Sequence, residues 1–174
     1  MMRYVILMLG LLLLVPHAPT LAAERDHPEA RPYDKKAEAS LAVNAALKQA
    51  GQTGKRVILV MGANWCHDSR GLAGWFEKPR FANMLRDRYE VVYVDVGKRN
   101  RNIDIAQRFG IEKIVGTPTV LVLSPEGELL NPDSAPTWRN AASRDADDIY
   151  AHFESFEVER ADKNEEAGGK QESR

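Results

Sequence analysis

Cysteine is almost absent from this sequence, because Cys66 is the only one among 174 residues. A single thiol cannot form a disulfide within the chain, so the fold must rest on its apolar core without a covalent crosslink. Cys66 can stay free, be capped by a small thiol or bond to another chain. A disulfide-linked dimer through Cys66 is therefore one possible assembly.

The sequence also lacks an excess of either charge. It has 24 Lys and Arg against 25 Asp and Glu, which gives a formal net charge of −1. Proteins that bind nucleic acid or an anionic membrane surface usually carry a basic patch that neutralises phosphates. We therefore expect no nucleic-acid partner. Hydrophobic residues make up 44% of the chain, which indicates a globular protein and not a disordered one.

A long hydrophobic run is missing as well. The apolar run at 4–15 has about 12 residues, whereas a helix that spans a bilayer needs roughly 20. It follows Arg3 and precedes the small residues Ala22 and Ala23. This layout predicts a secretory signal peptide over 1–22, no stable membrane anchor after its removal, and a periplasmic or secreted mature chain. An uncleaved N-terminal anchor is the alternative.

Turn-forming residues and hydrophobic periodicity divide the rest of the chain. Residues 23–33 are charged and contain prolines, which predicts a linker, and the highly charged residues 157–174 predict a disordered tail. Between them lies one predicted domain, 34–156. Strands that alternate with helices indicate an α/β protein whose sheet is covered on both faces. Helices are expected over 34–51 (capped by Asp34), 66–78, 79–89, 102–110 and 143–156 (capped by Ser143), and strands over 56–62, 90–97, 119–125 and 127–131.

Two short motifs lie where predicted elements meet. The tripeptide "NWC" at 64–66 follows a buried strand and opens a helix, and "GTPT" at 116–119 precedes another strand. With the closing hairpin and terminal helix, these motifs make the chain resemble the thioredoxin family, in particular its exported members with an incomplete redox motif. The resemblance implies a three-layer α/β/α sandwich with a mixed sheet of four to five strands. We expect no cofactor.

The chain departs from the family's dithiol motif at two positions. By the resemblance, the first catalytic cysteine matches Cys66, but the second matches Ser69, which leaves a Cys-x-x-Ser motif. The buried acid that the family carries six residues before the nucleophile matches Val60. Both departures remove the half of the dithiol cycle that resolves a mixed disulfide.

Cys66 is the candidate nucleophile. At a helix start, unpaired backbone N–H groups and the helix dipole favour the thiolate, which is the reactive form. Ser69 lies on the same helical face and can donate a hydrogen bond to that thiolate. His67 and Asp68 are candidates to tune the ionisation of the thiol in opposite senses. The alternatives are a buried structural cysteine, a serine that only caps the helix, and two solvated neighbours.

We expect no metal site at the cysteine. Cys66 and His67 are adjacent, and two adjacent residues do not make a coordination shell. The remaining candidate histidines, His27 and His152, are far from them in the sequence.

Three further residues are expected to line a substrate groove. Trp65 is predicted to flank the thiol as an exposed apolar wall, and packing into the core is the alternative. The resemblance implies that Thr117–Pro118 forms a cis peptide bond beside the nucleophile. The backbone of Thr117 would then pair with an extended substrate as an added strand does. A trans Pro118 that opens a strand is the alternative.

Two functions from different classes follow from these residues. The first is a monothiol thiol-disulfide oxidoreductase or isomerase, in which Cys66 forms mixed disulfides with client protein disulfides or small thiols. The second is a non-catalytic peptide-binding or chaperone-like module that uses the groove at Trp65 and Pro118, with Cys66 incidental. The reactivity of Cys66 separates the two.

Overall fold

The computed structural model describes residues 27–156. The predicted signal peptide over 1–22 and the predicted tail over 157–174 lie outside the described residues. Within the described part of the chain, no helix is both long enough and apolar enough to cross a membrane.

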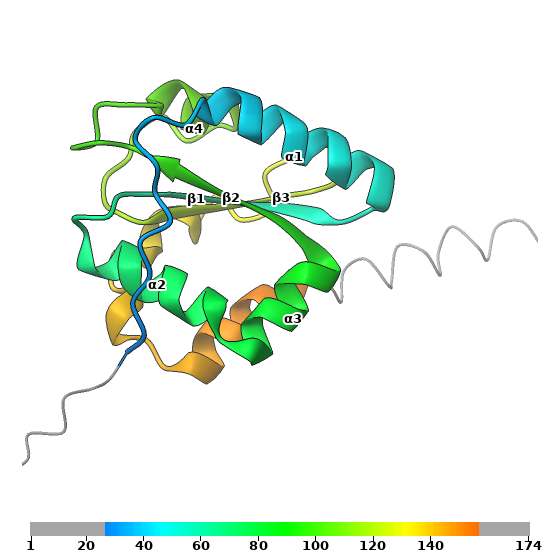
Figure 1. Ribbon diagram of the computed structural model, residues 1–174. Coiled ribbons are helices and arrows are strands. Elements are labelled where there is room, and N and C mark those ends of the chain that lie inside the picture. The colour runs from blue at the N-terminus through cyan, green and yellow to red at the C-terminus, as the bar shows by residue number, and fades with distance from the viewer. Residues whose placement is uncertain (1–26, 157–174) are drawn as a thin grey trace, which may run out of the picture.

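A mixed sheet forms the centre of the domain (Figure 1). Strand β1 (Arg56–Gly62) runs parallel to β2 (Tyr89–Asp95) and antiparallel to β3 (Thr119–Leu123), in the order β2-β1-β3. All residues of β1 are buried. A central strand covered on both faces cannot alternate apolar with polar residues, which explains its continuous apolar run.

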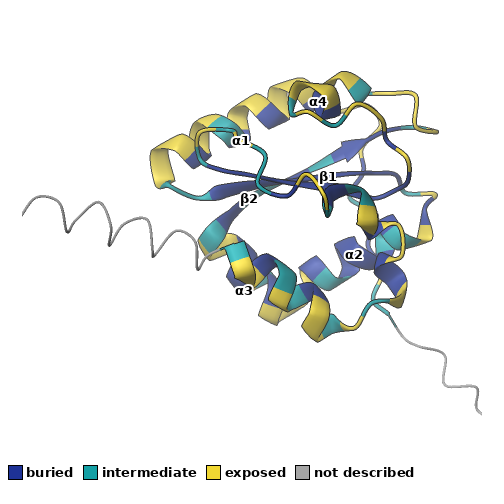
Figure 2. Cartoon of the chain, turned by 180° about the vertical axis from the view of Figure 1, so that it is seen from behind, coloured by how far each residue is buried: buried dark blue, intermediate teal, exposed yellow. Residues whose placement is uncertain are grey.

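Helices cover both faces of the sheet, as Figures 1 and 2 show. Successive side chains of β1 point to opposite faces, so Leu59 packs in the core with α1 (Ala39–Thr53) and α4 (Ile103–Arg108). Val60 packs in the other core, with α2 (His67–Glu77), α3 (Pro79–Arg88) and the helix at 146–156. The α/β class and the three-layer arrangement predicted from the sequence are therefore confirmed.

The sheet has three strands in the described residues, and the expectation of four to five was wrong. The predicted strand at 127–131 forms only an isolated bridge, between Leu123 and Leu129. The side chain of Asn131 takes the place of a further strand residue. Its Oδ1 accepts from the N–H of Val122 (2.8 Å), and its Nδ2 donates to the carbonyl of Val120 (2.9 Å). Backbone hydrogen bonds from Leu130 N–H to the Val122 carbonyl and from Ser124 N–H to the Glu128 carbonyl (both 2.8 Å) satisfy the rest of the β3 edge without a regular ladder.

Two helix boundaries also differ from expectation. Asp34 does not cap α1, because the helix begins at Ala39 and the Asp34 carboxylate accepts from the N–H of Lys36 in a preceding turn. The helix continues past Gly51 to Thr53 and is capped by Gly54, whose positive φ of 72° lets its N–H reach the carbonyl of Ala50. Ser143 lies in a short 3-10 turn, and the last helix begins at 146.

The described part of the predicted linker is not a linker. We call residues 27–33 the N-terminal segment, which lies along α2 before the chain passes to α1 (Figure 1). The N–H of Ala30 donates to the carbonyl of Arg70 (3.1 Å). Tyr33 and Asn64 exchange two hydrogen bonds, of 3.2 and 2.8 Å. Gly74 permits this approach, because a Cβ there would lie 2.3 Å from the backbone of Pro28.

Candidate active site

Cys66 lies at the junction of β1 and α2, as its position in the sequence predicts. It is the N-cap residue of α2, has an extended backbone and is 8% exposed. Its carbonyl accepts the N–H of Arg70 (3.1 Å), which closes the first helical turn. Among the described side chains none caps this helix end. Because the first-turn N–H groups have no side-chain acceptor, they remain available to a negative charge on Cys66.

The Thr117–Pro118 segment lies against the thiol. The peptide bond between these two residues is cis. The Sγ of Cys66 donates to the carbonyl oxygen of Thr117 at 3.2 Å. The hydroxyl of Thr119 donates to the carbonyl of Gly116 (2.9 Å), which fixes the turn at 116–119 that leads into β3. Two segments that are distant in the sequence therefore meet at the sulfur.

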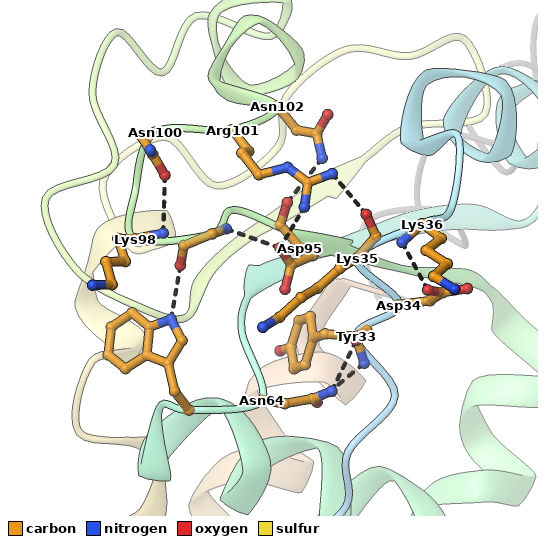
Figure 3. Close-up of polar contacts among 12 residues, drawn as sticks. Tyr33, Asp34, Lys35, Lys36, Asn64, Asp95, Lys98, Asn100, Arg101 and Asn102 are labelled. Carbon is orange, nitrogen blue, oxygen red and sulfur yellow. Dashed lines mark hydrogen bonds and ion pairs between the residues drawn. The ribbon is translucent and has the colours of Figure 1, made fainter.

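Trp65 stands at the surface beside Cys66. Its side chain is 54% exposed, and its indole N–H donates to the carbonyl of Gly97 (2.7 Å). The N–H of Gly97 donates to the buried carboxylate of Asp95 (3.0 Å), which also faces Arg101 at 3.6 Å. Figure 3 shows this chain of contacts from the end of β2 to the indole. Val115, at 53% exposed, is a second large apolar side chain at the surface, close to Thr117 in the sequence.

Ser69 is fully buried, and its hydroxyl lies beside that of Tyr33. A Cβ added at Gly62 would lie 2.5 Å from the Tyr33 hydroxyl and 2.6 Å from the Ser69 hydroxyl, so both oxygens converge on the space that this glycine leaves. By strict geometry neither hydroxyl makes a hydrogen bond within the described structure. The hydrogen bond of the Cys66 thiol goes to Thr117. The expectation that Ser69 stabilises the thiolate stays a prediction.

Tyr33 is a buried phenol in the neighbourhood of the thiol. Burial raises the pKa of Tyr33 well above 10.0, and the nearby Tyr93 raises it further. Pairing with Ser69 lowers this pKa, whereas negative charge on Cys66 or Asp95 raises it. The Tyr33 phenol therefore stays protonated as a neutral donor next to the start of α2.

Arg70 supplies a fixed positive charge near Cys66. Its Nε and Nη2 donate to the two carboxylate oxygens of Glu29, at 2.9 and 3.1 Å. Its Nη1 donates to the carbonyl of Asn64 in the loop that leads to Cys66 (3.2 Å). Hydrogen bonding to Glu29 raises the pKa of Arg70, and the negative charges of Glu29 and Cys66 add to the rise. This guanidinium is thus a permanent cation within electrostatic range of the thiol.

His67 and Asp68 face other partners. The half-exposed His67 ring lies 4.4 Å from the ring of His27, and its Nε2 lies 3.7 Å from Glu29. The carboxylate of Asp68 accepts the N–H of Ala142 (3.0 Å), which ties the turn at Ala141–Ser143 to α2. Their predicted effect on the thiol stays a prediction.

The sequence-based interpretation missed three residues of this neighbourhood: Tyr33, Glu29 and Arg70. The first two lie in a charged, proline-containing stretch that predicts a linker. One signal was available, because Tyr33 is a large aromatic residue in an otherwise polar stretch, and such a residue often anchors a segment to a core. Arg70 carries no such signal, since an arginine on a helix is ordinarily solvated.

Comparisons with known proteins agree with this fold. A thioredoxin-like family model matches residues 37–125, just over half of the chain. The crystal structure of a disulphide isomerase from Xylella fastidiosa Temecula1 is 31% identical, with a TM-score of 0.68 over 73% of this chain and 97% of that one. The chain therefore belongs to the thioredoxin-like family, as its motifs predict.

A second solved structure is more distant. It is a protein of unknown function from Pseudomonas aeruginosa, 20% identical, with a TM-score of 0.37 over 68% of this chain and 86% of that one. This similarity is too low to support an inference about fold or function. Among curated proteins none matches the chain.

Proposed function

We propose that this protein is an exported monothiol thiol-disulfide oxidoreductase or isomerase that acts through Cys66. The observation that carries the proposal is the position of the only thiol. It lies at the uncapped start of α2 and against the carbonyl of Thr117, in a chain that is 31% identical to a solved disulphide isomerase. Client protein disulfides and small thiols are the proposed partners.

The chemistry needs one thiolate and no net electron transfer. The Cys66 thiolate attacks one sulfur of a client disulfide, which forms a mixed disulfide and releases the other client sulfur as a thiolate. A client thiolate then attacks the client sulfur of the mixed disulfide. This step forms a new client disulfide and returns the Cys66 thiolate. The client is reshuffled and not reduced, as expected of an active site with Ser69 in place of a second thiol.

The charged groups around Cys66 support these steps. The first-turn N–H groups of α2 and the cation of Arg70 favour negative charge on the sulfur. When Cys66 ionises, it no longer donates to the Thr117 carbonyl. That oxygen is then free to accept a hydrogen bond from the backbone of a client. The exposed Trp65 and Val115 supply apolar surface for client side chains.

The test is recovery of activity by scrambled ribonuclease in a glutathione buffer, with the full chain and a Cys66→Ser variant. Cys66→Ser is expected to fall to the rate of buffer alone, because it has no nucleophile. The matched control is Ser40→Ala on the exposed face of α1, which should keep the full rate. A wild-type chain that gives no rate above buffer would overturn the proposal, as would a fully active Cys66→Ser variant.

A non-catalytic peptide-binding module is the second candidate. The observation that favours it is the contrast between a nearly covered Cys66 and the exposed Trp65 and Val115. In that case an unfolded client without cysteines binds wild type and Cys66→Ser equally, and Trp65→Ala weakens both. A disulfide-linked dimer through Cys66 is a further outcome, seen as a band of twice the mass that disappears on reduction.

We also propose that the protein is exported. This proposal rests on the layout of residues 1–22, with Arg3 before an apolar run and small residues at its end. Cell fractionation with N-terminal sequencing tests it. A mature chain that begins near Ala23 outside the cytoplasm is the expected result, and an intact N-terminus in the cytoplasm would contradict it.

A further inference from the structure

Two imidazoles and a carboxylate converge beside the start of α2. The rings of His27 and His67 meet edge to face, with centroids 4.4 Å apart. The Nε2 of His67 lies 3.7 Å from Oε1 of Glu29. One ligand atom from each of the three residues lies within 4.8 Å of the other two. His27 is far from His67 in the sequence, so no metal site was expected there, yet the fold brings the two rings into contact.

We propose that His27, Glu29 and His67 bind a divalent transition-metal ion of the Zn²⁺ type. Two neutral imidazole nitrogens and one carboxylate oxygen form a donor set that zinc prefers, and a fourth position is left for water. With metal–ligand distances of about 2.0–2.2 Å, tetrahedral donors lie roughly 3.3–3.5 Å apart. The three side chains must therefore close by about 1 Å, which small χ rotations of partly exposed side chains achieve.

The outer contacts of the cluster support metal binding. Arg70 holds both oxygens of Glu29, through Nε to Oε2 and Nη2 to Oε1. Each carboxylate oxygen has two lone-pair directions, so Oε1 can accept from Arg70 and still bind a metal. Carboxylate ligands of metals in proteins are themselves usually hydrogen-bonded in this way.

His27 supplies a second, independent observation. Its Nδ1 is buried and has no hydrogen-bond partner among the described residues. Burying a polar nitrogen without a partner is unfavourable. A metal on the cluster gives this histidine a ligand role, either at Nδ1 directly or at Nε2 with Nδ1–H free to bond water as the ring turns.

The backbone already places the donors. The N–H of Ala30, next to Glu29, donates to the carbonyl of Arg70. The backbone of Pro28 packs against α2 at Gly74, where there is no side chain in the way. His67 is the first residue of the same helix. A metal ion would therefore bind the N-terminal segment to α2 one residue from Cys66. The thiol itself is directed at Thr117, so it is not a ligand in this proposal.

The probe is Zn²⁺ alone, titrated calorimetrically into the full chain after treatment with a chelator. We expect one ion per chain, at least tenfold weaker binding in His27→Ala and in His67→Ala, and about tenfold weaker binding in Arg70→Met. Cys66→Ser and the distant, exposed Glu126→Gln are matched controls that should bind as wild type does. Far-UV circular dichroism checks that each variant is folded.

Two further measurements do not depend on removing a ligand. Gly74→Ala keeps all three donors but forces the backbone of Pro28 away, so it should also weaken Zn²⁺ binding. In wild type, Zn²⁺ should shift the imidazole NMR signals of His27 and His67 and leave those of His152 in place. Unchanged His27 and His67 signals, loss of binding in Cys66→Ser, or full binding in the His27→Ala/His67→Ala variant would each overturn the proposal. None of these readouts depends on thiol-disulfide exchange.

Discussion

The Sγ of Cys66 lies 3.2 Å from the carbonyl oxygen of Thr117 and donates its proton to it. This contact suits the neutral thiol, because a carbonyl oxygen accepts a proton and repels a negative sulfur. Ionisation therefore removes the contact and favours rotation of the sulfur toward the N–H groups at the start of α2. We expect the charges around that helix start to influence how readily Cys66 reacts.

Arg70 and Glu29 should change the reactivity of Cys66 in opposite directions. Arg70→Met removes a cation that is hydrogen-bonded to the loop before Cys66, so alkylation of Cys66 by iodoacetamide at neutral pH should slow. Glu29→Gln removes the carboxylate that neutralises Arg70. The charge of Arg70 then acts more strongly on Cys66, and alkylation should be faster than in wild type.

Arg70→Lys is the matched control, since it keeps the charge and loses the paired contacts to Glu29. It should retain most of the wild-type alkylation rate. If Lys and Met slow alkylation equally, Arg70 acts by holding the loop at Asn64 and not by its charge.

Ser69→Cys should restore a dithiol site. The two side chains stand three residues apart on one helical face, so the new thiol is placed to attack a Cys66 mixed disulfide. We expect an intramolecular disulfide under oxidising conditions, seen by mass spectrometry as the loss of two hydrogens. Mixed disulfides with a client should also be shorter-lived than in wild type.

Ser69→Ala is the control for that experiment and should trap client mixed disulfides as wild type does. Should the Ser69→Cys chain stay fully reduced in an oxidising buffer, residue 69 is too deeply buried to reach the sulfur of Cys66.

Tyr33 and Ser69 should contribute to stability as a coupled pair. Each single change, Tyr33→Phe or Ser69→Ala, leaves the other buried hydroxyl without its neighbour. Because neither hydroxyl meets strict hydrogen-bond geometry, each change should lower the free energy of unfolding by at most about 1 kcal/mol. The double variant should lose less than the sum, by about 0.5 kcal/mol.

Urea denaturation of the four chains measures this coupling, and Ser40→Ala serves as a surface control. Additive losses would mean that the two hydroxyls do not interact. The two side chains would then fill the space beside Gly62 by packing alone.

Acidification should destabilise the fold through His152. Burial lowers the pKa of this histidine from 6.5 to about 4, and the nearby cation of Arg144 lowers it further. Between those values the unfolded chain binds more protons than the folded one, so stability falls as pH drops from 6.5 to 4. The ring is partly exposed and screened, so the contribution is about 1–2 kcal/mol.

His152→Phe should make the free energy of unfolding less dependent on pH across this range. The ring already packs against Trp138, Phe153 and Phe156, and a phenyl group fits an apolar cluster. Ser40→Ala on the exposed face of α1 should leave the slope near that of wild type. An unchanged slope in His152→Phe would mean that other groups cause the acid sensitivity.

Much of the fold follows from local pattern. The continuous apolar run at β1 and the proline at the start of α3 indicate their elements because periodicity and backbone restriction act over a few residues. The missing fourth strand was not predictable in this way. The Asn131 side chain bonds the backbone of Val120 and Val122 at the edge of β3, and it reaches that edge only after the chain has turned back.

The sequence by itself determined that one thiol stands at the start of a helix after a buried strand, and that no second thiol can follow it. Only the tertiary structure decided that Tyr33, Glu29 and His27 belong to the same neighbourhood. Their contacts with α2 require the space left by Gly62 and Gly74, where a Cβ would collide with the N-terminal segment or with its side chains. Such contacts join residues far apart in the chain, and a pattern of local propensities does not encode which distant surfaces meet.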